Sequence, residues 1–138
     1  MISILDYGTG NLRSLSNALK FLKIDHIVTK NQKKILNSKK LIIPGVGSFN
    51  TGIQNLKKFG LVKVLQDFGN VQKKPILGTC AGLIMMSTFI ENDNRVAPLG
   101  ILDIEVTRNA YGSQADSFAG KININIDNQT PIIKAPFI

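Results

Sequence analysis

Residues 75–90 read PILGTCAGLIMMSTFI, and this stretch decides the fold. A short apolar run, Pro75 to Leu77, leads through Gly78-Thr79-Cys80-Ala81-Gly82 into a strongly apolar stretch from Leu83 to Ile90. The run has the length of a buried strand and the apolar stretch is typical of a buried helix. The pattern therefore predicts strand, sharp turn and helix, with a cysteine at the turn, which is the sulfur counterpart of the nucleophile elbow.

The N-terminal segment predicts the same order of elements. Ile2 to Tyr7 is rich in strand-forming residues and ends at the turn signal Gly8-Thr9-Gly10. Asn11 or Thr9 can cap the helix that follows. Its leucines lie at i, i+3, i+7 and i+10 and form a single apolar stripe: Leu12, Leu15, Leu19 and Leu22. We expect this stripe to pack against a sheet.

Two further strands are predicted between these segments, at His26 to Thr29 and at Leu41 to Ile43. The second is stopped by Pro44-Gly45-Val46-Gly47, and the apolar spacing from Ser48 to Phe68 suits two short helices broken near Gly60. This repeated alternation predicts an α/β fold with a mostly parallel open sheet, flavodoxin-like, and with helices on both faces.

The C-terminal part of the chain has a different sequence pattern. Ile101 to Val106, Ala119 to Ile126 and Pro131 to Ile138 read as antiparallel or edge strands, and Ile122, Ile124 and Ile126 alternate with polar residues. Because no repeat or linker interrupts the chain, residues 1–138 are expected to form a single domain. The last strand has nothing to cover it, so the C-terminal part of that domain is expected to be missing from this chain.

Composition narrows the class of protein. The chain has 138 residues, 43% of them hydrophobic, with neither a long apolar span nor a secretory signal, so we expect a cytoplasmic protein that does not enter a membrane. The net charge of +8 comes largely from scattered lysine doublets, which favour a solvated surface over a nucleic-acid site. The single cysteine excludes an internal disulfide and is either a small core residue or a reactive thiol.

The chemistry of the elbow favours the reactive thiol. A sharp turn lifts Cys80 above the carboxyl end of the sheet, and the flanking glycines let strand and helix approach closely. The helix N-terminus favours thiolate over thiol, and the backbone N–H groups that follow, Ala81 first, can stabilise an oxyanion. The alternative is a buried structural cysteine in a helix cap.

A second glycine-rich turn, Pro44-Gly45-Val46-Gly47-Ser48, also follows a strand and should lie at the same sheet edge as Cys80. Glycines allow backbone N–H groups to turn toward a substrate oxygen, so this turn is a candidate second half of an oxyanion hole. The alternative is a turn that only ends its strand.

These motifs resemble the class I (triad) glutamine amidotransferases, and two branches at once. Residues 6–14 (DYGTGNLRS) and 44–49 (PGVGSF) are similar to the glutaminase subunit of imidazole glycerol phosphate synthase. Residues 78–84 (GTCAGLI), 108–118 (RNAYGSQADSF) and 133–138 (IKAPFI) are similar to the glutaminase subunit of pyridoxal 5′-phosphate synthase. Together the two resemblances cover nearly the whole chain.

The resemblance implies hydrolysis of L-glutamine to glutamate and ammonia through a thioester on Cys80, with no metal or organic cofactor. Ammonia would pass to a synthase subunit with a (β/α)8 barrel. The pyridoxal branch is favoured, because the elbow and the Arg108 segment follow it, and the histidine-biosynthesis branch is the alternative. A non-catalytic module that binds glutamine or the barrel, and another cysteine hydrolase or glyoxalase-like protein, are further alternatives.

The resemblance also assigns site residues. Gly47 with Ser48 falls where glutamine and the oxyanion are held, and Arg108 matches a glutamine-binding arginine, whose planar fork suits a carboxylate. Ile133-Lys134 stands where the pyridoxal branch has Ile-Arg, and Val46-Gly47 replaces its Gly-Glu.

A general base is the missing part of this assignment. The family supplies it from a His-x-Glu segment near the C-terminus, and this chain ends before such a segment. The only histidine, His26, begins a strand, whereas Cys80 follows the end of one. In a parallel sheet these positions lie at opposite edges, so His26 is not expected to be the base.

Overall fold

The computed structural model describes residues 1–107, 110, 112, 118–124 and 130–137, and of residues 135–137 the backbone only. The chain forms two compact units, Met1–Val106 and Thr107–Ile138, which are described separately. The prediction of a single domain stays a prediction.

The first unit contains a four-stranded sheet in which all neighbouring strands are parallel, in the order β2-β1-β3-β4. The sheet strands and the helices that join them follow one another along the chain as β1 (Ile2–Leu5), α1 (Leu12–Phe21), β2 (His26–Thr29), α2 (Gln32–Asn37), β3 (Lys40–Ile43), α3 (Phe49–Lys58), α4 (Val62–Gln66), the π-helical turn η1 (Asp67–Val71), β4 (Ile76–Gly78) and α5 (Ala81–Met86). The predicted parallel α/β fold is therefore confirmed.

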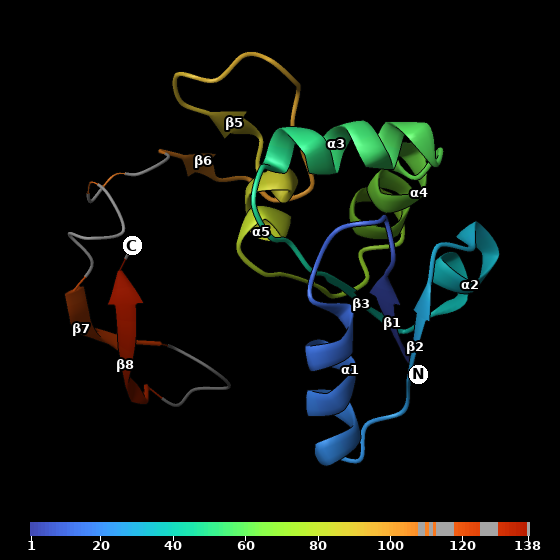
Figure 1. Ribbon diagram of the computed structural model, residues 1–138, viewed down its shortest axis with the longest axis horizontal. Coiled ribbons are helices and arrows are strands. Elements are labelled where there is room, and N and C mark those ends of the chain that lie inside the picture. Colours follow the sequence, from blue (N-terminus) through green and yellow to red (C-terminus); the bar gives the residue numbers. More distant parts are fainter. Residues whose placement is uncertain (108–109, 111, 113–117, 125–129, 138) are drawn as a thin grey trace. The chain divides into compact units, whose positions relative to one another are not determined.

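Helices cover both faces of this sheet (Figure 1). Alternate residues of a strand point to opposite faces. Accordingly Ile4 and Ile42 pack with Leu19 of α1 on one face. Leu5 and Ile43 belong to a larger cluster on the other face, together with residues of α2 to α5. The chain crosses from β1 to β2 in one direction along the sheet, and from β2 past β1 to β3 in the other. Right-handed crossovers in opposite directions place their helices on opposite faces, which accounts for this arrangement.

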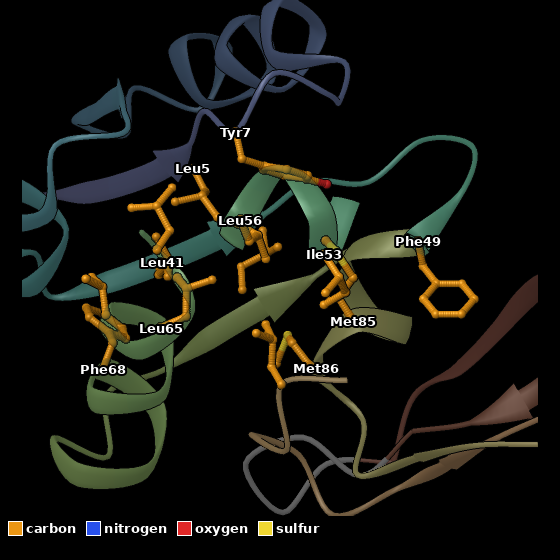
Figure 2. Close-up of a cluster of buried hydrophobic side chains, with 14 of the residues drawn as sticks. Leu5, Tyr7, Leu41, Phe49, Ile53, Leu56, Leu65, Phe68, Met85 and Met86 are labelled. Atoms are coloured by element: carbon orange, nitrogen blue, oxygen red, sulfur yellow. The ribbon is translucent and has the colours of Figure 1, made fainter. Parts of the chain in front are cut away.

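The larger cluster is the main core of the first unit (Figure 2). Its fully buried side chains come from β1 and the loop after it, from β3, from the helices α2 to α5 and from η1, and include Leu5, Tyr7, Ile35, Leu41, Ile43, Phe49, Ile53, Leu56, Leu65, Phe68 and Met85. All members of both clusters lie before residue 102. Burial of one such side chain stabilises a fold by about 1.5–3 kcal/mol, so this core holds the edge of the sheet rigidly.

The strand order reverses between β1 and β3, because the chain moves from β1 to β2 on one side and from β2 to β3 on the other. In open α/β sheets the crevice outside the carboxyl ends of the strands at such a switch point is the usual place for a ligand. Each of these two strands is followed by a turn with glycines at positive φ, Gly8 and Gly10 after β1 and Gly47 after β3.

Several boundaries differ from the predictions. Helix α2 was not predicted; it begins after Asn31, whose side-chain oxygen accepts a hydrogen bond from the Lys34 N–H at 3.1 Å. The predicted helix from Leu83 to Ile90 is wrong beyond Met86. There the Ser87 hydroxyl donates to the Ile84 carbonyl at 2.8 Å and ends the helix, and Phe89–Ile90 is strand β5.

The C-terminal strands are partly as predicted. Strand β6 (Glu105–Val106) pairs with β5 in a two-stranded sheet, so it is an edge strand, one of the two predicted alternatives for Ile101 to Val106. The pairing is parallel, so the antiparallel alternative is wrong. In the second unit β7 (Phe118–Asn123) and β8 (Ile132–Phe137) form an antiparallel pair, as predicted. Ile122 and Ile124 are half-buried, Lys121 and Asn123 are exposed, and Ile126 lies outside the described residues.

Candidate active site

The Cys80 turn has the backbone of a nucleophile elbow. Cys80 has φ 51° and ψ −123°, a conformation that residues other than glycine rarely adopt. Before it, the Thr79 N–H donates to the Ile43 carbonyl at 3.1 Å and extends the ladder between β3 and β4. After it, the Leu83 N–H donates to the Cys80 carbonyl at 2.9 Å and starts α5. The turn between these bonds leaves the thiol exposed.

Two glycines bring the residues Pro44 to Ser48, called the glycine loop below, against this elbow. A Cβ built on Gly45 would lie 2.1 Å from the backbone nitrogen of Gly82, and a Cβ built on Gly82 would lie 2.0 Å from the Ile43 oxygen. Side chains at either position are incompatible with these distances. The predicted placement of the two motifs at one sheet edge is therefore found in the structure.

Backbone N–H groups without an acceptor occur in the glycine loop and directly after Cys80. The N–H groups of Gly47 and Ala81 donate to no acceptor in the part of the chain that the structure describes. Gly47 has φ 67°, Val46 is 51% exposed, and the Ser48 side chain makes no cap hydrogen bond to α3. Unpaired N–H groups beside an exposed thiol are what an oxyanion requires.

Tyr7 connects the loop after β1 to the glycine loop. Its side chain is buried, and its O–H donates to the Pro44 carbonyl. Figure 2 shows the ring lying along α3 with its oxygen at the end nearer the connection from β3 to α3. Burial raises the pKa of Tyr7, a hydrogen bond with Thr9 lowers it, and the charge of Cys80 raises it further. Tyr7 therefore stays protonated and continues to donate at neutral pH.

A cluster of polar side chains lies at the other end of the glycine loop. Asn50, in the first turn of α3, is buried, and its amide oxygen faces the Arg95 guanidinium. Arg95 also forms an ion pair with Asp93. The site residues predicted from the sequence did not include Tyr7, Asn50, Asp93 or Arg95. Of these four, only Tyr7 has a recognisable sequence signal, because it is an aromatic residue with a polar tip directly before a glycine turn. Nothing in the sequence indicates that residue 50 contacts residues 93 and 95.

His26 lies away from this edge, as expected. It opens β2 at one side of the sheet, whereas Cys80 follows β4 at the other side. Three strand spacings of about 4.8 Å each separate β2 from β4. His26 Nδ1 lies 2.9 Å from the Ile24 carbonyl and therefore donates to it, so Nε2 accepts from the Ser16 hydroxyl at 2.8 Å.

The remaining predicted site residues do not belong to the first unit. Arg108 lies outside the described residues. Ile133 and Lys134 lie in β8 of the second unit, where they pair with Ile122 and Lys121. Among the described residues there is no group of three or more His, Cys, Asp or Glu side chains that could hold a metal, and no helix is long and apolar enough to cross a membrane.

Comparison with known proteins places this site in a family. A family model described as the SNO glutamine amidotransferase family matches residues 8–138. The PdxT subunit of pyridoxal 5′-phosphate synthase from Thermoanaerobacter sp. is 40% identical over 134 residues, which are 94% of this chain and 69% of that protein. A HisH subunit of imidazole glycerol phosphate synthase from Methanococcus maripaludis is 37% identical over 108 residues, 78% of this chain and 53% of that protein.

Solved structures agree with the sequence comparisons. A crystal structure of a glutamine amidotransferase superposes with a TM-score of 0.79 at 26% identity and covers 99% of this chain and 70% of its own. The chain spans about half the length of the HisH relatives it matches and 69% of the PdxT relative. A family match over residues 8–138, a similar fold and a cysteine elbow against a glycine loop all agree: the chain belongs to the SNO glutamine amidotransferase family.

Proposed function

We propose that this chain is a glutaminase, in which Cys80 releases ammonia from the side chain of L-glutamine. The observation that carries the proposal is the contact between the glycine loop and the elbow, which sets an exposed thiol beside unpaired backbone N–H groups. Thiol nucleophiles with a preorganised oxyanion site are suited to acyl transfer from an amide.

In the proposed reaction the Cys80 sulfur attacks the amide carbon of glutamine, and the amide oxygen takes up the negative charge. The N–H groups of Ala81 and Gly47 donate to that oxygen, with Gly45 and Val46 shaping the loop and Ser48 at its end. The proton lost by the Cys80 thiol is transferred to the amide nitrogen, and cleavage of the carbon–nitrogen bond releases ammonia and leaves a γ-glutamyl thioester. Water hydrolyses this thioester to glutamate and returns the free Cys80 thiol. Arg108, Ile133 and Lys134 are proposed to hold the glutamine.

The general base is not His26 in this proposal, because His26 is on the far edge strand and its ring nitrogens face Ser16 and Ile24. The second candidate function follows from this observation. It is a module of the same fold that binds glutamine or a partner without turnover.

We propose a synthase subunit with a (β/α)8 barrel as the acceptor of the ammonia, and pyridoxal 5′-phosphate synthase first. The PdxT relative aligns with 94% of this chain, whereas the alignment with the HisH relative covers 78%. The glycine loop sequence PGVGSF favours the histidine-biosynthesis alternative. Copurification with each barrel subunit would separate these two assignments, and binding to neither would remove both.

A cytoplasmic location is part of the proposal, because a free thiol nucleophile needs a reducing compartment. No metal or organic cofactor is required by the proposed chemistry.

The test is mass spectrometry of the chain after treatment with 6-diazo-5-oxo-L-norleucine, a glutamine mimic that alkylates glutaminase thiols, with ammonia release from glutamine assayed in parallel. We expect one adduct, on Cys80, and none in Cys80→Ala. Adduct with ammonia release establishes the glutaminase. Adduct without release favours the binding module, and a folded chain that forms no adduct contradicts a glutamine site.

A further inference from the structure

A second set of contacts holds the far end of the glycine loop. Residues 91–98 form the connection that follows β5, and Arg95 in this connection faces Asn50 in the first turn of α3. Arg95 Nε donates to Asp93 Oδ1 at 2.9 Å and Arg95 Nη2 to Asp93 Oδ2 at 2.5 Å. Its hydrogen-bonding neighbours assign the Asn50 amide with the oxygen toward Arg95, and in that orientation the same two nitrogens lie 3.0 and 2.7 Å from the oxygen. We call Asn50, Asp93 and Arg95 the Arg95 clamp.

Each member of the Arg95 clamp needs the others. Asn50 is 8% exposed, and the Asp93 side chain is 6% exposed, so neither is satisfied by bulk water. The Arg95 side chain is 67% exposed and keeps its outer surface in solvent. Hydrogen bonds from Arg95 hold the pKa of Asp93 well below its usual range, and Asn50 adds to this. The carboxylate is therefore ionised at neutral pH and binds the guanidinium fork in two places.

The connection that carries Asp93 and Arg95 is itself fixed to α5. The Leu99 N–H donates to the Met85 carbonyl at 2.8 Å and the Ile101 N–H to the Met86 carbonyl at 2.9 Å. The Arg95 clamp thus links the first turn of α3 to the connection formed by residues 91–98. The residues directly after this connection are hydrogen-bonded to the end of α5, the helix that follows Cys80. A Cβ on Gly52 would lie 2.5 Å from the Met85 sulfur, so α3 and α5 also touch directly.

Contacts within the glycine loop do not hold it in place. Ser48, the residue before α3, makes no side-chain cap hydrogen bond, and a Cβ on Gly47 would meet nothing within 4 Å. The loop is held at its start by the Tyr7 hydroxyl on Pro44 and by the packing of Gly45 on the elbow. Its end is two residues from Asn50. The direction of the Gly47 and Ser48 N–H groups therefore depends on the first turn of α3, which the Arg95 clamp fixes.

We propose that Arg95, acting with Asp93 through Asn50, is a positioning residue that fixes the oxyanion-binding N–H groups of the glycine loop relative to Cys80. This inference rests on the proposed glutaminase function for its chemical consequence. Arg95 does not touch the reacting atoms. Its contribution is geometric, because misplacing a donor weakens oxyanion stabilisation while leaving the thiol itself unchanged.

The experiment uses the 138-residue chain with Arg95→Met, with Arg95→Lys as a variant that keeps the charge but loses the fork, and with Lys57→Met as the control. Lys57 is an exposed cation near the C-terminal end of α3, the helix that carries Asn50. Lys57→Met therefore removes one positive charge, as Arg95→Met does. Two quantities are measured for each protein. One is amide hydrogen exchange by segment, and the other is the ratio of Cys80 alkylation rates with 6-diazo-5-oxo-L-norleucine and with iodoacetamide, which needs no oxyanion site.

Within residues 45–52 the Gly52 N–H donates to the Ser48 carbonyl at 3.2 Å and is therefore protected from exchange. We expect its exchange to rise at least about tenfold in Arg95→Met, as for loss of a charge-assisted hydrogen bond, and less in Arg95→Lys. The ratio of the two alkylation rates should fall by a similar factor, because only the glutamine mimic depends on the loop. Lys57→Met should change neither quantity.

Three results would overturn the inference: unchanged exchange in residues 45–52, a rise of exchange spread over the whole first unit, or a local rise with an unchanged ratio. Should Arg95→Met fail to fold, Arg95→Lys is judged by the same two quantities. If the unmodified chain does not react with the glutamine mimic, the proposed function fails, and exchange alone then decides whether Arg95 positions the loop.

Discussion

At the residue scale, Gly45 and Gly82 set how closely the glycine loop and the cysteine elbow approach. Both sites are crowded by backbone atoms, which cannot move aside as a flexible side chain would. Gly45 meets the backbone of Ala81 and Gly82, and Gly82 meets the carbonyl of Ile43. Gly45 and Gly82 are thus required because they have no side chain. A single methyl group at either position would overlap these backbone atoms.

Gly82→Ala should destabilise the chain by about 3 kcal/mol, the upper part of the usual cost of overpacking. Helix propensity alone predicts the opposite sign, because Ala is favoured over Gly inside a helix by about 1 kcal/mol. Urea unfolding decides between them. The control is Gly100→Ala, where a Cβ meets nothing within 4 Å but φ is 62°, and a cost of only about 1 kcal/mol is expected. A Gly82→Ala variant as stable as the parent would contradict the tight contact.

Tyr7 gives a second prediction at this scale. Because burial raises its pKa, Tyr7 should ionise above 10.0, the ordinary value for tyrosine. Ionisation of the phenol removes the donor to Pro44. The stability that Tyr7 contributes is therefore fully present below pH 10 and is lost as the pH rises through the folded-state pKa. The absorbance titration at 295 nm of the parent minus that of Tyr7→Phe isolates this group, and a midpoint at or below 10 would be inconsistent with its buried hydrogen bond.

At the scale of single elements, polar caps and loop contacts decide where helices begin and end. The sequence predicted α1 with Asn11 or Thr9 as its cap, and in the structure the cap is Asn11, whose oxygen accepts from the Ser14 N–H at 3.2 Å. It missed α2, a six-residue helix with only Ile35 fully buried. A short helix with one apolar anchor leaves too little periodicity to recognise.

Asn31→Ala should test the capping of α2. Loss of the hydrogen bond from the Lys34 N–H is expected to destabilise the chain by about 1 kcal/mol, the typical value for an N-cap. Lys33→Ala, an exposed position in the same helix, should be nearly neutral. Thermal and urea unfolding measure both variants. Equal stabilities of the two variants would mean that α2 is held by Ile35 rather than by its cap.

At the scale of the whole molecule, the division of the buried core between the two units matters most. Every residue of the two buried clusters lies between Ile2 and Ile101, within the first unit. The described strands of the second unit are one antiparallel pair. A two-stranded pair is at best marginally stable alone in water.

A fragment of residues 1–106 should therefore unfold cooperatively in urea, with the far-UV and near-UV circular dichroism changing together. A peptide of residues 107–138 should show no cooperative transition. The matched comparison is the full chain under the same conditions. Loss of the cooperative transition in the 1–106 fragment would show that the first unit depends on residues 107–138, against the distribution of its core.

Local sequence was sufficient for the strands β1 to β4, for α1 and for the elbow. Apolar runs of strand length, each ended by glycine, proline or a polar turn, determine where these strands stop, and the order of these runs along the chain determines a parallel sheet. The approach of residues 44–48 to Cys80 followed from the same rule, because both segments leave the carboxyl ends of neighbouring strands.

The contacts that orient the site depended on tertiary structure. The Tyr7 hydroxyl reaches Pro44 and Arg95 reaches Asn50 only after folding, from positions that are far away along the chain. Helix α5 likewise ends at Met86 because residues 99–102 bond to its last carbonyls, although the apolar sequence continues. Periodicity within a segment reports which side of that segment is buried, whereas a hydrogen bond between two segments depends on distances that only the packed fold determines.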